Sequence, residues 1–137
     1  DKHDNIIVDC GGADSKAMRS ALSLADVALL PFRPKRRDLK VAPAMSDLIE
    51  SAKALNQKLN VFSCITQAPT LPSQRYRIDG AKSLLQELGL NPLTNETRNL
   101  NAWDDADESG FSIFEWHDEK AKLDGKQLFD ELMEKSK

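Results

Sequence analysis

An aspartate followed by two glycines stands at the end of a short apolar run near the start of the chain. Residues 6–8 are β-branched, which is typical of a buried strand, and Asp9 follows them directly, with Gly11 and Gly12 next. In phosphate-transfer proteins an aspartate in this position holds Mg²⁺, directly or through water, and the glycine lets a backbone N–H approach the terminal phosphate. An aspartate that only caps the next turn is an equally open interpretation on spacing alone.

Two groups of basic residues are candidates for contact with phosphate groups of DNA. Residues 33–40 contain five basic residues and one aspartate. The positions assigned to a DNA contact are Lys35, Arg36, Arg37, Arg75, Arg77 and Lys82. Charge runs are usually solvated, so DNA is the less favoured interpretation of residues 33–40. The acidic residues of 104–108 are interpreted as a solvated helix face, and they would keep any DNA surface away from them.

Composition limits the class of protein that can carry these residues. The chain has 137 residues, 40% of them hydrophobic and 30% charged, as in a soluble domain with one core. A net charge of −3 excludes a strongly basic nucleic-acid binder as a description of the whole chain. Cys10 and Cys64 lie in apolar runs and are predicted to be buried, reduced thiols. No membrane-spanning run or signal peptide is recognised, so a cytoplasmic protein is expected.

Strands and helices are predicted to alternate along the chain. Buried strands are predicted at residues 6–8, 27–30 and 59–65, with a weak one near Leu93. Helices are predicted to begin at Asp14 or Ser15, at Asp38, at Asp79 and at about Asp118, and another spans 101–108. Their core-facing residues are predicted to be Ala17, Met18, Ala21, Leu22 and Leu24; Val41, Met45, Leu48, Ile49, Ala52 and Leu55; Ala81, Leu84, Leu85 and Leu88; and Ala121, Leu128, Phe129, Leu132 and Met133.

This alternation predicts a single α/β domain over residues 1–137. Continuously apolar strands separated by amphipathic helices favour a doubly wound, mostly parallel sheet with helices on both faces. Ligands of such sheets bind beyond the carboxyl ends of the strands. Asp9, the segment from Pro31 to Pro34 and Thr66 are all expected at that edge. Pro43 is tolerable in the first turn of the helix after Asp38 and would otherwise kink it.

The motifs, taken in order, resemble the second half of ParA-type partition ATPases, the deviant-Walker family that includes MinD. The resemblance rests on Ile-Val-Asp-Cys-Gly-Gly at 7–12, Ala-Asp before the strand at 27–30, Pro-Phe-Arg-Pro at 31–34, the strand at 61–66, and Gly-Phe-Ser-Ile-Phe-Glu at 110–115 after Trp103. It implies a P-loop NTPase-like fold. It also implies that Asp9 is the catalytic aspartate that organises Mg²⁺, and that ATP is bound by Gly11, Gly12, Pro31, Pro34 and Thr66.

The resemblance also implies a mechanism and partners for the intact protein. MgATP would drive homodimerisation, and the dimer would bind nonspecific DNA on the nucleoid and a centromere-binding adaptor, without a membrane. The family's phosphate-binding loop should lie well before Asp9, and only eight residues precede it here. The chain is therefore expected to be the C-terminal portion of such an ATPase, inactive alone. The alternative left open is a non-catalytic α/β interaction module that has lost nucleotide binding.

Overall fold

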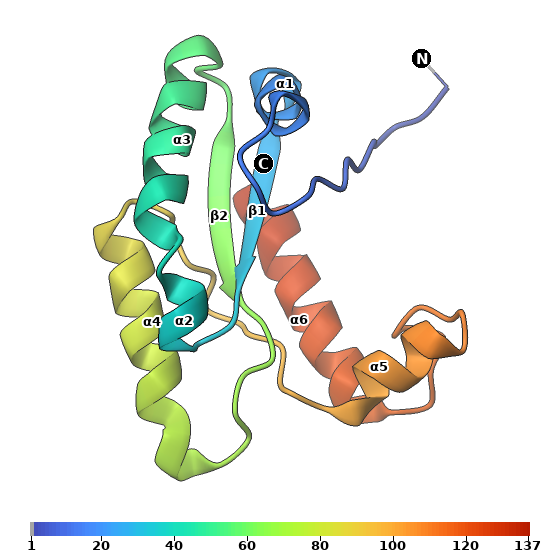
Figure 1. Cartoon of the computed structure of the whole chain (residues 1–137). Coiled ribbons are helices and arrows are strands. Elements are labelled where there is room, and N and C mark those ends of the chain that lie inside the picture. The colour runs from blue at the N-terminus through green and yellow to red at the C-terminus, as the bar shows by residue number, and fades with distance from the viewer. Residues whose placement is uncertain (1) are drawn as a thin grey trace.

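The computed structural model describes residues 2–137, which are built around a two-stranded parallel sheet (Figure 1). β1 (Val27–Phe32) pairs with β2 (Asn60–Ile65), with Val27 opposite Asn60 and Phe32 opposite Ile65. The helices are α1 (Lys16–Leu24), α2 (Arg36–Leu39), α3 (Ala42–Leu55), the 3-10 turn η1 (Pro72–Gln74), α4 (Arg75–Glu87), α5 (Asn101–Glu108) and α6 (Glu119–Lys135). Among residues 2–137, no helix has both the length and the apolar character needed to cross a membrane.

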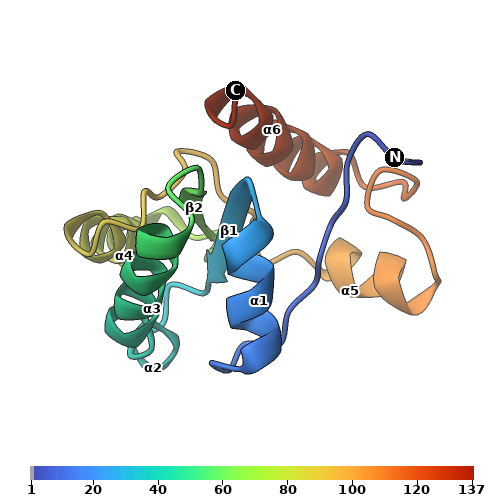
Figure 2. The same cartoon turned by 90° about the horizontal axis from the view of Figure 1, so that it is seen from above.

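The helices are distributed over both sides of this small sheet. α1 and α3 lie on one side, α6 lies on the other, and α4 lies beside β2 (Figures 1 and 2). The arrangement confirms an α/β class with a parallel sheet, as the alternation of apolar strands and amphipathic helices predicts.

β2 is the more buried strand because it has neighbours along both edges. On the side away from β1, the backbone of Ser63 donates to Asn91 and accepts from Leu93, at 3.1 and 2.8 Å. This single parallel bridge is all that forms of the weak strand predicted near Leu93. β1 has no second strand beside it within residues 2–137, and Leu29 is 38% exposed. The sheet therefore ends in an open edge at β1.

Helix caps account for several boundaries that the sequence predicts correctly. Ser15 caps α1 by accepting from the N–H of Met18 at 3.1 Å. Asp118 caps α6 by accepting from the N–H of Ala121 at 2.9 Å. Gly110, with φ at 75°, follows the end of α5, whose predicted bounds are confirmed.

The strand predicted at residues 6–8 is wrong for this structure. The segment before α1 is irregular, and Ile7 is 94% exposed. A β-branched run favours extended backbone, but a strand also needs an edge with which to pair, and residues 2–137 provide no partner here. Extended propensity is local, whereas strand pairing depends on the rest of the sheet.

Two predicted helix starts are also wrong. The helix expected from Asp38 is divided into α2 and α3, because Pro43 has no N–H to donate to the carbonyl of Leu39. Pro43 accordingly lies in the first turn of α3, the tolerable position. α4 begins at Arg75 rather than at Asp79, and the Asp79 carboxylate instead accepts from the Arg75 guanidinium one turn earlier, at 3.3 Å.

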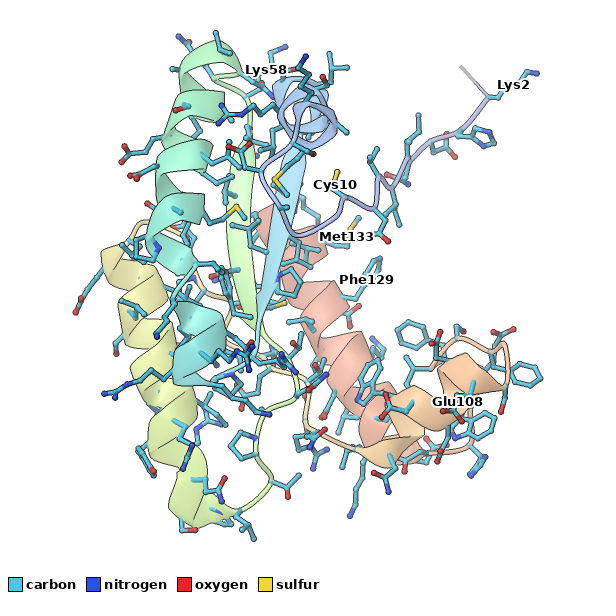
Figure 3. The ribbon with its side chains drawn as sticks, in the orientation of Figure 1. Lys2, Cys10, Lys58, Glu108, Phe129 and Met133 are labelled. Atoms are coloured by element: carbon cyan, nitrogen blue, oxygen red, sulfur yellow. The ribbon has the colours of Figure 1, made fainter. Side chains whose placement is uncertain are left out.

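The predicted core face of α6 is mostly wrong. Of the residues assigned to it, only Ala121 is buried, while Phe129 and Met133 are 53% and 45% exposed (Figure 3). The face of α6 that touches the rest of the protein carries two carboxylates instead, as described below. Among the residues predicted to face the core on other helices, Ala17, Leu24, Val41 and Leu55 are exposed.

The two cysteines differ in environment. Cys64 is buried in β2, and burial raises the pKa of its thiol to about 11. Cys10 lies in the irregular N-terminal segment and is only half-buried (Figure 3). It packs against the main core, which is formed by buried residues of β1, β2, α1, α3 and α4. The prediction of a buried thiol is therefore confirmed for Cys64 and only partly for Cys10.

Candidate functional site

The carboxyl ends of β1 and β2 lie side by side and bring two predicted segments together. The N–H of Thr66 donates to the carbonyl of Phe32 at 2.9 Å, which continues the parallel ladder one step beyond β2. The segment from Pro31 to Pro34 is therefore a neighbour of Thr66. Pro34 is buried, Thr66 is half-buried and Pro31 is exposed. In parallel α/β sheets this edge is the usual place for a ligand.

The segment 97–99 runs beside the chain that follows β2 and is joined to it by backbone hydrogen bonds. Thr97 donates to the carbonyl of Ile65 at 3.0 Å, and the N–H of Ala68 donates to the carbonyl of Thr97 at 2.9 Å. Gln67 allows the turn between these bonds by adopting a φ of 50°, in the left-handed region. The backbone after β2 is therefore held in one position by its neighbours.

A polar hollow of about 160 Å³ lies next to this edge, between the start of α4, the 94–98 segment and α6. Its lining residues are Arg75, Thr94, Asn95, Glu96, Arg98, Asp124 and Gln127. Glu96 accepts from Lys82 at 2.6 Å and also from Arg75. The hydrogen bond that the Arg98 guanidinium donates to Asp124 raises the pKa of Arg98, which burial alone would lower. The charged groups that line the hollow are thus paired with one another, which is typical of a structural network.

Two carboxylates of α6 attach this helix to the 94–98 segment. Asp124 accepts from the N–H of Arg98 at 3.0 Å and from its guanidinium. Glu131 accepts from the N–H groups of Thr94 and Asn95 at 2.7 and 2.9 Å. Burial would raise the pKa of Glu131, but these two N–H groups, together with the side chains of Asn95 and Lys135, lower it to about 2.

The role of these two carboxylates was not predicted from the sequence. The signal that could have found them is their separation of seven residues, two turns apart on one face of an amphipathic helix. They interrupt the apolar pattern on the side of α6 that packs on the protein.

Asp9, Gly11 and Gly12 are not brought to the carboxyl edge. All three are exposed in the irregular N-terminal segment. A Cβ added at either glycine would meet nothing within 4 Å, so packing in this structure does not require a glycine there. Residues 2–137 also contain no group of three His, Cys, Asp or Glu side chains placed to hold a metal ion. Within residues 2–137, Asp9 and the two glycines do not meet Pro31, Pro34 and Thr66 at one site.

The basic residues predicted to contact DNA fall into two groups with different surroundings. Lys35, Arg36 and Arg37 are exposed at and before α2, and Arg77 is exposed on α4, 5.6 Å from the centre of the Tyr76 ring. Arg75 and Lys82 instead pair with Glu96.

Comparison with known proteins gives two relatives of this chain. No family model matches it. It is 33% identical over 100 residues to protein ParA of Rhizobium radiobacter, which covers 67% of this chain and 43% of that protein. It is 26% identical over 114 residues to the maintenance of carboxysome distribution protein A of Halothiobacillus neapolitanus, covering 82% of this chain and 51% of that protein. The chain thus spans about half the length of the curated relatives it matches.

Proposed function

We infer that this chain, which belongs to the ParA-type family, is the C-terminal portion of an ATPase that segregates DNA or distributes a cellular body. The observation that carries the proposal is the joined carboxyl edge of β1 and β2, together with similarity to a partition protein and a distribution protein. The loop 31–34 and Thr66 lie together at this edge, where ligands of parallel α/β sheets bind, which supports the proposal of a nucleotide site there.

The open edge of β1 supports the proposal that, in the intact protein, further strands continue this sheet into a larger, doubly wound one. A parallel sheet of two strands is unusual, because parallel sheets are normally buried on both faces and continued by further strands. Leu29 and the apolar residues 6–8 are exposed at the surface of this structure. We propose that these surfaces contact the part of the intact protein that corresponds to the half of the relatives not spanned by this chain. That part would include a P-loop NTPase-like nucleotide-binding unit.

ATP and Mg²⁺ are assigned to the intact protein. Asp9 is proposed as its catalytic aspartate, and Gly11, Gly12, Pro31, Pro34 and Thr66 as its nucleotide-binding residues. The arrangement of residues 2–137 does not assemble these groups, so the chain alone is expected to be inactive. The proposed partners are a second copy of the protein and a centromere-binding adaptor, in the cytoplasm or on the nucleoid.

Nonspecific DNA is proposed as a further partner of the intact dimer. Of the predicted set, Lys35, Arg36, Arg37 and Arg77 are exposed and do not pair with Glu96, unlike Arg75 and Lys82. Replacing the three residues of 35–37 by alanine should weaken DNA binding equally on all sequences and reduce its salt dependence. Unchanged affinity at low salt would contradict this assignment.

The nucleotide proposal is tested on the longer protein. The coding region upstream of Asp1 is expected to encode a phosphate-binding loop with its lysine. In the intact protein, Asp9→Ala should abolish ATP hydrolysis while the circular dichroism spectrum stays unchanged. Asp4→Ala is the matched control, because Asp4 is an exposed aspartate of the same segment. Normal turnover in Asp9→Ala would remove its catalytic role, and an upstream region without such a loop would favour the non-catalytic interaction module.

A further inference from the structure

Residues 101–121 form a small apolar cluster that is separate from the main core. Its buried members are Ala102, Ala106, Ile113 and Ala121, and Trp103 and Trp116 pack against them. Gly125 of α6 lies so close that an added Cβ would be 3.3 Å from Cη2 of Trp103. The cluster therefore positions α5 and the loop after it against the beginning of α6.

The loop after α5 is held rigidly by its own hydrogen bonds. The N–H of Phe111 donates to the carbonyl of Ala106 at 2.9 Å. The Glu115 carboxylate accepts from both the N–H and the hydroxyl of Ser112, each at 2.8 Å. Ile113 is buried beneath this turn. The backbone that carries Phe111 and Phe114 is thus fixed by hydrogen bonds within residues 106–115.

Two aromatic side chains of this turn are half-exposed. Phe111 and Phe114 are 52% and 55% exposed, and the Phe111 ring lies 6.1 Å from the ring of Trp116. Because Phe111 also packs on Trp116, and Phe114 on Gly125 of α6, these half-exposed rings would lose little conformational entropy on binding, which favours them as contacts for a partner.

The surroundings of these rings are strongly acidic. Residues 101–119 include no lysine and no arginine, although the whole chain has a net charge of only −3. The acidic residues of this segment are Asp104, Asp105, Asp107, Glu108, Glu115, Asp118 and Glu119. Glu108, the last residue of α5, is labelled in Figure 3. Nucleic acid and anionic lipid would be repelled by this segment, whereas a cationic segment would be attracted.

We propose that Phe111, Phe114 and the acidic residues around them, here called the acidic platform, dock a lysine- or arginine-rich segment of another protein that also carries an apolar anchor. The cations of the partner would face the carboxylates and the aromatic rings, and its apolar side chains would cover Phe111 and Phe114. This surface uses none of the residues assigned to the nucleotide, so it stands or falls independently of the ATPase proposal.

Intrinsic fluorescence can report binding directly, because both tryptophans of the chain belong to this cluster. The probe is a tryptophan-free peptide that combines lysines with leucines. Two reference peptides replace its lysines by glutamates or its leucines by glycines. We expect the lysine–leucine peptide to change tryptophan emission saturably, with affinity falling on the order of tenfold from low to high salt. Both reference peptides should bind at least about tenfold more weakly.

Variants then locate the binding surface by calorimetry. Phe111→Ser with Phe114→Ser should weaken peptide binding by about tenfold or more. Asp107→Asn with Glu108→Gln should reduce both affinity and salt dependence. Phe129→Ser is the matched control for removing an exposed aromatic ring. Asp47→Asn with Glu50→Gln, two exposed acids of α3, is the matched control for charge. Circular dichroism verifies that each variant keeps its helix content.

Three outcomes would overturn the proposal. One is equal affinity for the platform variants and their matched controls. The second is equal binding of the lysine–leucine and glutamate–leucine peptides. The third is concentration-dependent self-association of the wild-type chain that Phe111→Ser with Phe114→Ser abolishes, because a second copy would then be the occupant of this surface.

Discussion

Asp124 on α6 accepts hydrogen bonds from both the backbone N–H and the guanidinium of Arg98, which fixes the helix against the segment that follows β2. Asp124 is buried, whereas the Arg98 side chain is partly exposed. Removing the carboxylate would leave a backbone donor without its acceptor, which is costly in a buried position.

We expect Asp124→Ala to lower the free energy of unfolding by about 2 kcal/mol. Asp124→Asn should cost less, because the amide oxygen can still accept from the backbone N–H. Urea unfolding measures both changes. The matched control is Asp130→Ala, whose exposed pair with Lys126 lies on the same helix and should contribute less than about 0.5 kcal/mol. Equal costs at the two positions would show that the bond to Arg98 adds nothing to stability.

Glu131 should make the stability of the protein depend on pH in acid. Its folded-state pKa is about 2, below the ordinary value of 4.5, so its contribution is complete above pH 4.5 and is lost as pH falls toward 2. Glu131→Gln should therefore be less stable than the wild type at neutral pH, by at most about 3 kcal/mol, with a smaller difference at pH 3. Unfolding curves at several pH values test this.

Glu134→Gln serves as the control for that series, since Glu134 is exposed on the same helix. Its stability should follow that of the wild type over the whole range. A constant difference between wild type and Glu131→Gln from pH 7 to pH 3 would contradict the assigned role of the Glu131 carboxylate.

Two glycines in helices should respond differently to alanine. At Gly80 of α4 an added Cβ meets nothing within 4 Å, so Gly80→Ala should stabilise the protein by about 0.5 to 1 kcal/mol through helix propensity. At Gly125 the added Cβ lies 3.3 Å from Trp103, 3.4 Å from Ile113 and 3.5 Å from Phe114. Gly125→Ala should therefore gain less stability and should shift tryptophan emission. An equal gain at both positions, with unchanged emission, would show that the small cluster is loosely packed.

The two thiols should react at different rates with a disulfide reagent. Cys64 is buried and its pKa is raised to about 11, so at pH 8 it has neither access nor thiolate. Cys10 is half-buried in an irregular segment and should react in the folded protein. We expect one thiol to react before denaturation and a second after it. In Cys10→Ser, any rapid reaction of the folded protein would mean that Cys64 is accessible.

Elements with strong local signals were predicted well from the sequence. β1 and β2 are continuous apolar runs, and α1 and α6 begin at capping side chains that the sequence identifies. The family resemblance of the ordered motifs is confirmed by the similarity to two curated relatives. The doubly wound sheet remains a proposal, since the sheet formed by residues 2–137 has two strands.

Features that depend on distant partners could not be predicted in this way. Residues 6–8 have the composition of a strand, but their pairing is not encoded in their own periodicity. Leu128 and Leu132 follow a helical apolar pattern, yet α6 is oriented by Asp124 and Glu131, whose partners lie some thirty residues earlier. The contact between the 31–34 loop and Thr66 was predicted because parallel strands place their carboxyl ends together. In this structure Asp9 lies in the irregular N-terminal segment and not at that edge, so its place there in the intact protein stays a proposal.

Attachment through carboxylates also allows α6 to unfold locally, separately from the rest of the protein. A helix held by hydrogen bonds to a loop can be released while the apolar core around β2 remains intact, so its opening requires less free energy than complete unfolding. Amide hydrogens in the second half of α6 should then exchange with solvent long before those of β2. Near pH 2, where Glu131 gains a proton, an acid protease should remove the end of this helix first and leave a shorter, folded remainder.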